Sequence, residues 1–231
     1  MPNPFRYFNS SPEVIRLAVM MYVRYPLSLR QVEDLLFRRG IDISYETVRF
    51  WWNRFGPIFA AELRKRRQRQ GQYSLWGWHL DEVFVRINGQ QHYLWRAVDH
   101  EGEVLEVYAS KTRNRKAALR FLRRALKRYG SPHEVVTDRL RSYGAAFKTL
   151  GMQDRQRCEQ WLNNRAENSH QPFRRRERAM GKFRSHKTLQ KFASVHASLH
   201  NHFNRERHLT SRKTYKQNRA AALTEWNAVA A

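Results

Sequence analysis

Three acidic residues, Asp81, Asp138 and Glu167, occur at positions where their carboxylates could bind a cation or take part in catalysis. Asp81 lies in the segment WHLDEVFVRI, where strand alternation places it on one face with Val83 and Val85. Asp138 closes the apolar run EVVT, and Glu167 lies in the helix-prone segment NNRAENSHQPFRRR. A carboxylate among valines is costly unless a cation compensates its charge. Taken singly, Asp138 is typical of a turn and Glu167 of an exposed helix face, so only the three together indicate a site.

The chemistry that suits such a set is the cleavage of phosphodiesters. In-line displacement at phosphorus uses two divalent cations about 3.5–4 Å apart. Mg²⁺ prefers oxygen ligands and is held by a few carboxylates plus substrate phosphate, and Mn²⁺ accepts the same ligands. Because close carboxylates repel one another, we expect the cation-free cluster to be electrostatically strained.

The net charge predicts a polyanionic partner. Lys and Arg number 44 against 20 Asp and Glu, a formal charge of +24, with basic clusters in residues 62–70, 113–128 and 173–184. Nucleic acid is the commonest such partner. An anionic membrane surface fits less well, because no basic segment leaves an apolar face without a core role. A merely basic, soluble surface is the remaining alternative.

The location of the protein is predicted from what the sequence lacks. The lone cysteine, Cys158, cannot form an intrachain disulfide or a zinc cluster. No apolar run approaches the ~20 residues of a membrane span, and the first residues do not resemble a signal peptide. We therefore expect a cytoplasmic protein with no membrane part.

The N-terminal part predicts three helices. Ser11, Ser28 and Ser44 are helix-capping residues, and apolar residues recur at helical spacing after each of them until Gly56-Pro57. Two short helices joined by about four residues around a glycine are typical of a helix-turn-helix. The third helix, about 45–55, would present Arg49 and Asn53 outward to guanine and adenine edges. Any three-helix packing unit with a solvated polar face is the alternative.

The middle of the chain changes to strand periodicity. Residues 76–87, 91–99 and 103–110 predict a three-stranded meander with a hairpin at Asn88-Gly89. A helix ending at Gly130 and a buried strand at 134–138 follow, which predicts an α/β domain with a mixed sheet. Further helices are expected near 141–150, 163–184 and 187–205, and a fifth strand near 155–161. The polar tail after residue 206 is helix-prone, with Trp226 as its one large anchor.

Extended motifs carry a family resemblance. The order strand–Asp, strand–Asp, helix–Glu resembles the DDE transposases and retroviral-type integrases, which have RNase H-like folds. The segments WHLDEVFVRINGQQHYLWRAVD, VVTDRLRSYGAA and NNRAENSHQPFRRRER resemble bacterial transposases of the insertion-sequence-six type. The segment PLSLRQVEDLLFRRGIDISYETVRFWWNRFGP resembles the N-terminal part of that family. The resemblance spans roughly residues 10–215.

The resemblance implies a DNA transposase that binds the terminal inverted repeats of an insertion sequence. It implies that Asp81, Asp138 and Glu167 are the catalytic and metal-binding residues, with Mg²⁺ (or Mn²⁺) as cofactor. Metal-dependent 3′-end cleavage and strand transfer into target DNA would follow, in a homodimer or higher synaptic complex. Arg174 matches the basic residue that the family places near the active site. The arginines at 174–176 and the residues Arg64, Lys65, Arg66 and Arg67 are expected to contact DNA phosphates.

The predicted organisation has four parts. These are a helix-turn-helix module (1–62), a basic linker or helix tail (63–74), an RNase H-like catalytic domain (75–205) and a polar helical tail (206–231). One alternative function is a helix-turn-helix regulator, which Asp81 on an apolar strand face argues against. The other is a catalytically inactive transposase remnant, which the intact set of three carboxylates argues against.

Overall fold

The computed structural model describes residues 3–69, 71, 75–158, 163–181, 183–204 and 210–230, without the side chains of residues 164, 165 and 167. The helices are α1 (Pro12–Arg24), α2 (Leu29–Phe37), α3 (Tyr45–Arg69), α4 (Arg115–Tyr129), α5 (Arg141–Leu150), the 3₁₀ turn η1 (Gln153–Arg155), α6 (Asn164–Met180), α7 (His186–Phe203) and α8 (Arg212–Asn227). The strands are β1 (Gly77–Ile87), β2 (Gln90–Asp99), β3 (Val104–Ser110), β4 (Glu134–Val136) and β5 (Gln156–Arg157). Among these helices, none is both long enough and apolar enough to cross a membrane.

The chain forms two compact units. Unit 1 contains Met1–Arg66, Arg175–Met180 and Ser198–Ala231, and unit 2 contains Arg67–Arg174 and Gly181–Ala197. Helices α3, α6 and α7 each contribute residues to both units. The compact units therefore differ in their boundaries from the four consecutive segments expected from the sequence.

Unit 2 is built on a mixed sheet. In the described part of the chain, five strands lie in the order β3-β2-β1-β4-β5. Strands β1, β2 and β3 form the predicted antiparallel meander. After the α4 crossover, β4 pairs with β1 in parallel, and after α5, β5 pairs with β4 in parallel. The predicted α/β fold, a mixed sheet flanked by helices and preceded by a helical region, is confirmed.

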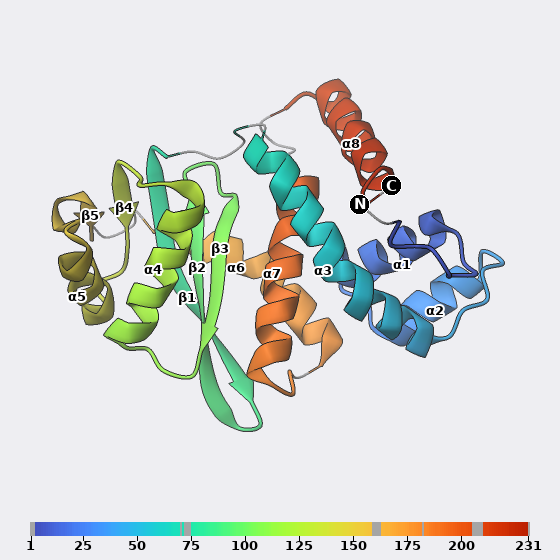
Figure 1. Ribbon diagram of the computed structural model, residues 1–231, viewed down its shortest axis with the longest axis horizontal. Helices are drawn as coiled ribbons and strands as arrows, with labels where there is room; N and C mark the ends of the chain where they lie inside the picture. Colours follow the sequence, from blue (N-terminus) through green and yellow to red (C-terminus); the bar gives the residue numbers. More distant parts are fainter. Residues whose placement is uncertain are drawn as a thin grey trace. The chain divides into compact units, whose positions relative to one another are not determined.

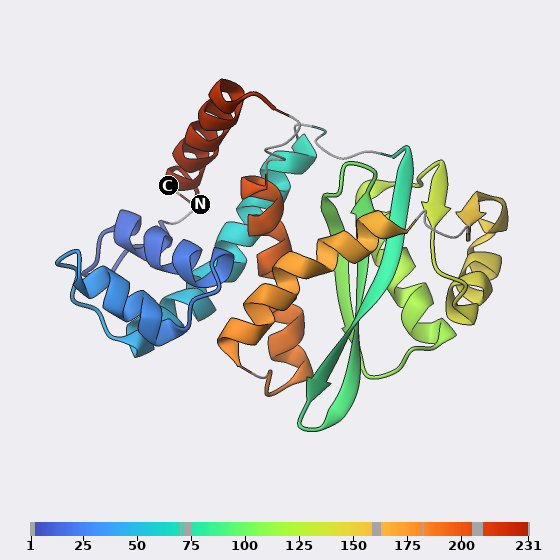
Figure 2. The same cartoon turned by 180° about the vertical axis from the view of Figure 1, so that it is seen from behind.

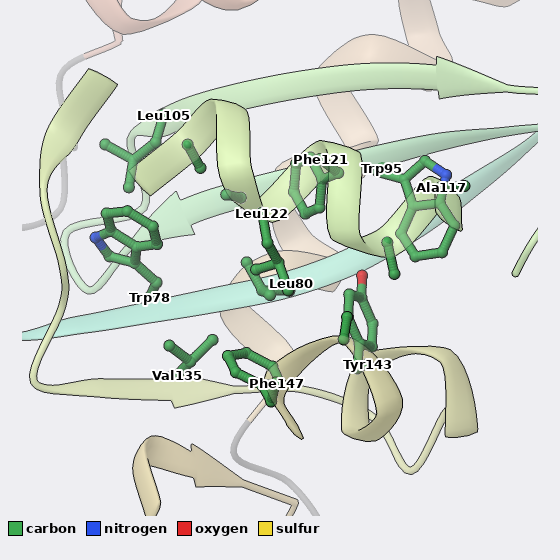
Figure 3. Close-up of a cluster of buried hydrophobic side chains, with 14 of the residues drawn as sticks. Trp78, Leu80, Trp95, Leu105, Ala117, Phe121, Leu122, Val135, Tyr143 and Phe147 are labelled. Atoms are coloured by element: carbon green, nitrogen blue, oxygen red, sulfur yellow. The ribbon is translucent and has the colours of Figure 1, made fainter. Parts of the chain in front are cut away.

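One face of the sheet carries the main core of unit 2. Alternate residues of the strands, among them Trp78, Leu80 and Trp95, pack with Phe121 of α4 and Phe147 of α5 (Figure 3). Figure 1 shows α4 lying across this face. Helix α4 ends at Gly130, whose φ of +84° is accessible to glycine at little cost. Burial of these aromatic residues fixes the position of β1, which carries Asp81.

The opposite face carries the first part of α6 and α7, as seen from behind in Figure 2. Phe173 of α6 packs on Phe183 and on Phe192 of α7, with ring centroids 6.2 and 6.4 Å apart. Gln190 of α7 pairs with the edge strand β3: its Oε1 accepts from the Ala109 amide at 2.7 Å, and its Nε2 donates to the Val107 carbonyl at 3.0 Å. Helix α7 thus closes the edge of the meander.

The three predicted N-terminal helices are present with their caps. The Ser11 and Ser44 hydroxyls accept from backbone amides three residues on, and Ser28 forms a capping box with Gln31. Two expectations were wrong. Residues 38–44, longer than the expected turn of about four, join α2 to α3, and α3 continues through Pro57 to Arg69.

Helix α3 continues because its buried stripe does. Phe59 and Leu63 lie one and two turns beyond Phe55 and are buried with it, and this packing outweighs the hydrogen bond that Pro57 cannot donate. Residues 63–69 are therefore a helix tail. Residues 70 and 72–74 of the predicted linker lie outside the described residues.

Unit 1 is completed by its last segment. Trp226 of α8, 1% exposed, meets Phe59 edge-on at 5.4 Å. Arg66 of α3 donates to the carbonyls of Glu225 and Ala228, and Arg16 of α1 donates to that of Val229. The predicted helical tail and its tryptophan anchor are confirmed, and both belong to the core of this unit.

Candidate active site

Strands β1 and β4 bring two of the predicted residues together. In their parallel register, His79 pairs with Val136. Asp81 lies two residues after His79, and Asp138 lies two residues after Val136, so the two aspartates come at the same level of the sheet. Asp138 follows the end of β4, where its Oδ1 accepts from the Leu140 amide at 3.1 Å. The predicted juxtaposition of the two aspartates is therefore observed, and each carboxylate is partly exposed.

A third carboxylate at this point, Glu82, was missed by the sequence analysis. Carboxylate oxygens of Asp81, Glu82 and Asp138 all lie within 4.8 Å of one another. The Glu82 side chain is 0% exposed, and its Oε1 has no hydrogen-bond partner. A sequence signal did exist, because Glu82 alternates with Trp78 and Leu80 on the strand face that forms the core.

Arg113, in the loop between β3 and α4, joins two of these carboxylates. Its Nε donates to Glu82 Oε2 at 2.9 Å, and its Nη2 donates to Asp138 Oδ2 at 3.0 Å. Burial raises the pKa of Glu82, against the effect of the Tyr143 hydroxyl and of Arg113, which stabilise its charged form. Burial lowers the pKa of Arg113, but Glu82 and Asp138 more than offset this, and its pKa is raised. The Arg113 guanidinium therefore balances part of the repulsion between Glu82 and Asp138.

Asp81 faces a different arginine, Arg96, which is buried. Arg96 of β2 lies opposite Asp81 in the antiparallel register, is 1% exposed, and donates to the Ser169 carbonyl of α6 at 3.0 Å. Burial lowers the pKa of Arg96 to about 10, which leaves it charged at neutral pH. His170 Nε2 lies 3.7 Å from Asp81 Oδ2, but burial, aided by the charges of Arg96 and Arg174, lowers the pKa of His170 to about 3. The imidazole is thus neutral, and its contact with Asp81 is not an ion pair.

Glu167 lies in the first turn of α6, on the predicted helix, and its side chain lies outside the described residues. Ser169 and His170 follow it directly, and they contact Arg96 and Asp81 as described above. Residues three apart on a helix share a face, so the backbone position of Glu167 and that of His170 belong to one side of α6. Helix α6 contains Pro172 and continues past it to Met180.

The donor set fits a divalent cation of the hard class. All three clustered groups offer carboxylate oxygen, the ligand that Mg²⁺ and Mn²⁺ prefer. The residues present are thus consistent with metal binding.

The arginines of α6 divide into exposed and buried groups. Arg174 is partly exposed, and its Nη2 donates to the Phe84 carbonyl of β1 at 2.6 Å, while Arg175 is exposed. Arg176 is 1% exposed, and its Nε donates to the Tyr22 carbonyl at 2.6 Å. The expectation that Arg176 contacts phosphate was therefore wrong, because this guanidinium is part of the core of unit 1.

The basic cluster on α3 also has partners within the chain. Arg64 donates to the Ser198 hydroxyl at 2.7 Å, Arg66 bonds to Glu62 and the end of α8, and Arg67 forms an ion pair with Glu103. Lys65 is exposed. Three of the four predicted phosphate-binding residues thus have structural roles, and Lys65 is the member best placed to meet a ligand.

Helix α3 presents Arg49 and Asn53 on its exposed side, as predicted. Arg49 forms an ion pair with Glu46 at 2.9 Å, with both side chains about half exposed. Phe50 lies beside them and is 54% exposed, which is unusual for a large apolar residue. This face of α3 therefore combines donors with an exposed aromatic ring.

Comparison with known proteins identifies the catalytic part. A family model described as a DDE domain of the IS240 type matches residues 75–206. The chain is 32% identical over 180 residues to the transposase for insertion sequence-like element IS431mec of Staphylococcus aureus strain Mu50, covering 76% of this chain and 79% of the relative. The transposase for insertion sequence element IS257 in transposon Tn4003, also of S. aureus, matches with the same identity and coverage.

Solved structures give weaker likenesses. An intasome chain of simian T-cell lymphotropic virus, solved with PP2A regulatory subunit B56 gamma, has a TM-score of 0.39 at 14% identity, covering 56% of this chain and 49% of its own. The Mos1 transposase catalytic domain, solved with raltegravir and Mg, has a TM-score of 0.34 at 15% identity, covering 71% of this chain and 91% of its own. The family assignment therefore stands on the DDE-domain match and on the sequence relatives.

Proposed function

Because the chain belongs to the DDE transposases of the insertion-sequence-six type, we propose that it cleaves DNA at the ends of an insertion sequence and joins them to target DNA. The observation that carries this proposal is the cluster of Asp81, Glu82 and Asp138 oxygens within 4.8 Å, inside the matched DDE domain. A regulator that only binds DNA has no need of three adjacent carboxylates.

In this proposal Asp81, Asp138 and Glu167 hold the divalent cations, with Mg²⁺ as the cofactor and Mn²⁺ as a substitute. When bound, such ions supply Lewis-acid activation of the attacking oxygen and stabilise charge at phosphorus. In the first reaction, water attacks a phosphodiester at the element end, the bond to the 3′-oxygen breaks, and a 3′-hydroxyl is released. In the second, that hydroxyl attacks a target phosphodiester and displaces its 3′-oxygen.

The remaining predicted residues would bind DNA. Arg174 and Arg175 follow Glu167 on the same helix and would hold phosphates beside the site, with Lys65 as a further contact. Arg49 and Asn53 would read bases in the terminal repeats, with the three N-terminal helices acting as a helix-turn-helix module. Joining two element ends calls for a homodimer or a larger synaptic complex on DNA. Such a protein would work in the bacterial cytoplasm, at the nucleoid.

The test is Asp138→Asn in the full chain. This change keeps the shape of the side chain but removes the charge that holds the cation, so Mg²⁺-dependent cleavage and strand transfer should be lost while terminal-repeat binding persists. Asp154→Asn, on the exposed 3₁₀ turn, is the matched control and should retain both activities. Full cleavage by folded Asp138→Asn protein at saturating Mg²⁺ would return a DNA-binding regulator to first place.

A further inference from the structure

Arg113 is a charged residue at the site for which the proposed reaction provides no role. Its guanidinium lies between Glu82 and Asp138, and its Nη2 is 2.7 Å from Glu82 Oε2 and 3.0 Å from Asp138 Oδ2. One positive group therefore bridges two of the three carboxylates that cluster within 4.8 Å. A divalent cation bound by the same oxygens would lie close to this guanidinium.

The backbone holds Arg113 in this place. Its carbonyl accepts from the Ser142 hydroxyl of α5 at 3.0 Å. The next residue, Asn114, caps α4 by accepting from the Ala117 amide at 3.0 Å. The guanidinium also lies over the Phe84 ring, 5.4 Å from its centroid. These contacts come from α4, α5 and β1, so the arginine is presented by a fixed loop.

The partner that needs Arg113 most is Glu82. Its side chain is 0% exposed, while that of Asp138 is 39% exposed and can be solvated. Removing one partner of a buried ion pair leaves an uncompensated charge and is strongly destabilising. Asp138 also has the Leu140 amide as a donor, so part of its orientation does not depend on Arg113.

We infer that Arg113 is a positioning residue that serves as the site's own counter-ion: it keeps the carboxylates together without metal and limits the affinity for a divalent cation. The inference rests on the proposed function. Among the described residues, Asp81, Glu82 and Asp138 carry three negative charges, and Arg113 and Arg96 carry two positive charges. Arg96 is fully buried against Ser169 of α6, whereas Arg113 is part-exposed and bonds directly to Asp138, so Arg113 is the arginine that a cation at Asp138 would meet. Its charge opposes an incoming dication at close range.

The experiment measures Mn²⁺ binding to the full chain by electron paramagnetic resonance, together with the melting temperature in chelator. Arg113→Met, which keeps the length and removes the charge, should bind Mn²⁺ more tightly, on the order of tenfold. Its cation-free melting temperature should fall, and added Mn²⁺ should raise it more than in the unmodified protein. Arg113→Lys keeps the charge and should restore an affinity near that of the unmodified protein.

The matched control is Arg128→Met. Arg128 and Arg124 of α4 hold the buried Glu106 at 2.8 and 3.1 Å, so the chemistry is similar at a place away from the cluster. This variant should leave Mn²⁺ affinity unchanged. If Arg113→Met does not fold, Arg113→Met combined with Glu82→Gln removes both partners of this ion pair and should fold. The double variant should bind Mn²⁺ more tightly than Glu82→Gln alone, which lacks the same carboxylate.

The outcomes separate the two proposals. If the unmodified protein binds Mn²⁺ and Arg113→Met binds it equally or more weakly, or the double variant binds it no more tightly than Glu82→Gln alone, the counter-ion role is overturned. If the unmodified protein binds no Mn²⁺ at all, the metal-dependent reaction itself is overturned. Equal tightening in Arg128→Met would show a nonspecific effect of net charge and would also overturn the inference.

Discussion

At the scale of single residues, each aspartate at the site has an arginine beside it. Asp81 faces Arg96 across the β1–β2 ladder, and Asp138 is bonded to Arg113. Removing the Asp138 charge therefore also removes an ion pair, one that is partly solvated. Such pairs contribute about 0–1 kcal/mol, so we expect the stability of Asp138→Asn to stay close to that of the unmodified protein. A loss of activity in this variant would then report on cation binding rather than on folding.

A second prediction at this scale concerns base recognition by Arg49. Its side chain is about half exposed on α3, held by Glu46 in a surface ion pair that a guanine edge can replace. Arg49→Ala should cost about 1–3 kcal/mol of binding free energy at terminal repeats and much less on random duplex. Fluorescence anisotropy of the full chain on both duplexes gives the comparison.

Lys65→Ala is the natural control for Arg49. Loss of one phosphate contact should weaken binding to every sequence and lower the slope of log affinity against log salt by roughly 0.9. Equal losses on repeat and random DNA in Arg49→Ala would show that this residue contacts only the backbone.

The site was partly predictable from residue types. Asp81 and Asp138 were predicted as neighbours because each interrupts or ends an apolar strand, and their juxtaposition depends only on strand pairing. Glu82 obeys the same rule on the other strand face, but a carboxylate next to a stronger candidate was passed over. Nothing in the residues next to Arg113 indicates that it contacts the carboxylates, because it is one of many basic residues in this part of the chain. Its contacts depend on the geometry of the loop between β3 and α4.

At the scale of elements, local signals gave the helix starts and tertiary packing decided one helix end. Serine caps and the Asn88-Gly89 turn depend on neighbouring residues alone, so their predictions match the structure. The end of α3 depends on tertiary packing instead. The sequence predicted that this helix ends near Gly56-Pro57, but the burial of Phe59 and Leu63 extends it past Pro57. Similarly, β4 ends at Val136, since its ladder with β1 spans only Gly77 to His79.

The capping box of α2 gives a prediction for this scale. Ser28 Oγ accepts from the Gln31 amide at 3.2 Å, and Gln31 Oε1 accepts from the Ser28 amide at 2.7 Å. Ser28→Ala should lower the free energy of unfolding of unit 1 by about 0.5–2 kcal/mol, measured by urea denaturation. Ser28→Asp retains an acceptor at the cap and should lose much less. Equal losses in both variants would show that the hydroxyl acts in some other way.

At the scale of the whole molecule, each compact unit is assembled from separated parts of the chain. The core of unit 1 joins α3 to α8 through Phe59 and Trp226, and includes Arg176 of α6 on Tyr22. The sequence predicted consecutive modules because the composition changes along the chain. No local pattern indicates that α8 packs against α1 and α3. A fragment ending near residue 62 would lack these partners, so DNA binding is best measured on the full chain.

Trp226→Ala tests this organisation. Removing a fully buried tryptophan typically costs about 3–5 kcal/mol, and the loss should be greatest in unit 1. Hydrogen exchange should accelerate in α1 and in the first half of α3 while the β1–β3 meander keeps its protection. Trp76→Ala, which truncates a 70% exposed tryptophan, is the control and should change neither. Equal acceleration in the meander would mean that the two units unfold as one.

The contact of Gln190 with β3 bears on how the protein behaves in a crowded solution. An open strand edge invites pairing with a second chain, which is how sheets grow between molecules. The Gln190 amide group occupies the Ala109 amide and the Val107 carbonyl, just as a neighbouring strand would, and His186 Nε2 lies 2.7 Å from the Ala109 carbonyl. At the other edge, β5 is only two residues long. The described strands therefore leave little open edge on either side of the sheet for pairing with a second chain, which disfavours aggregation through the sheet at high protein concentration.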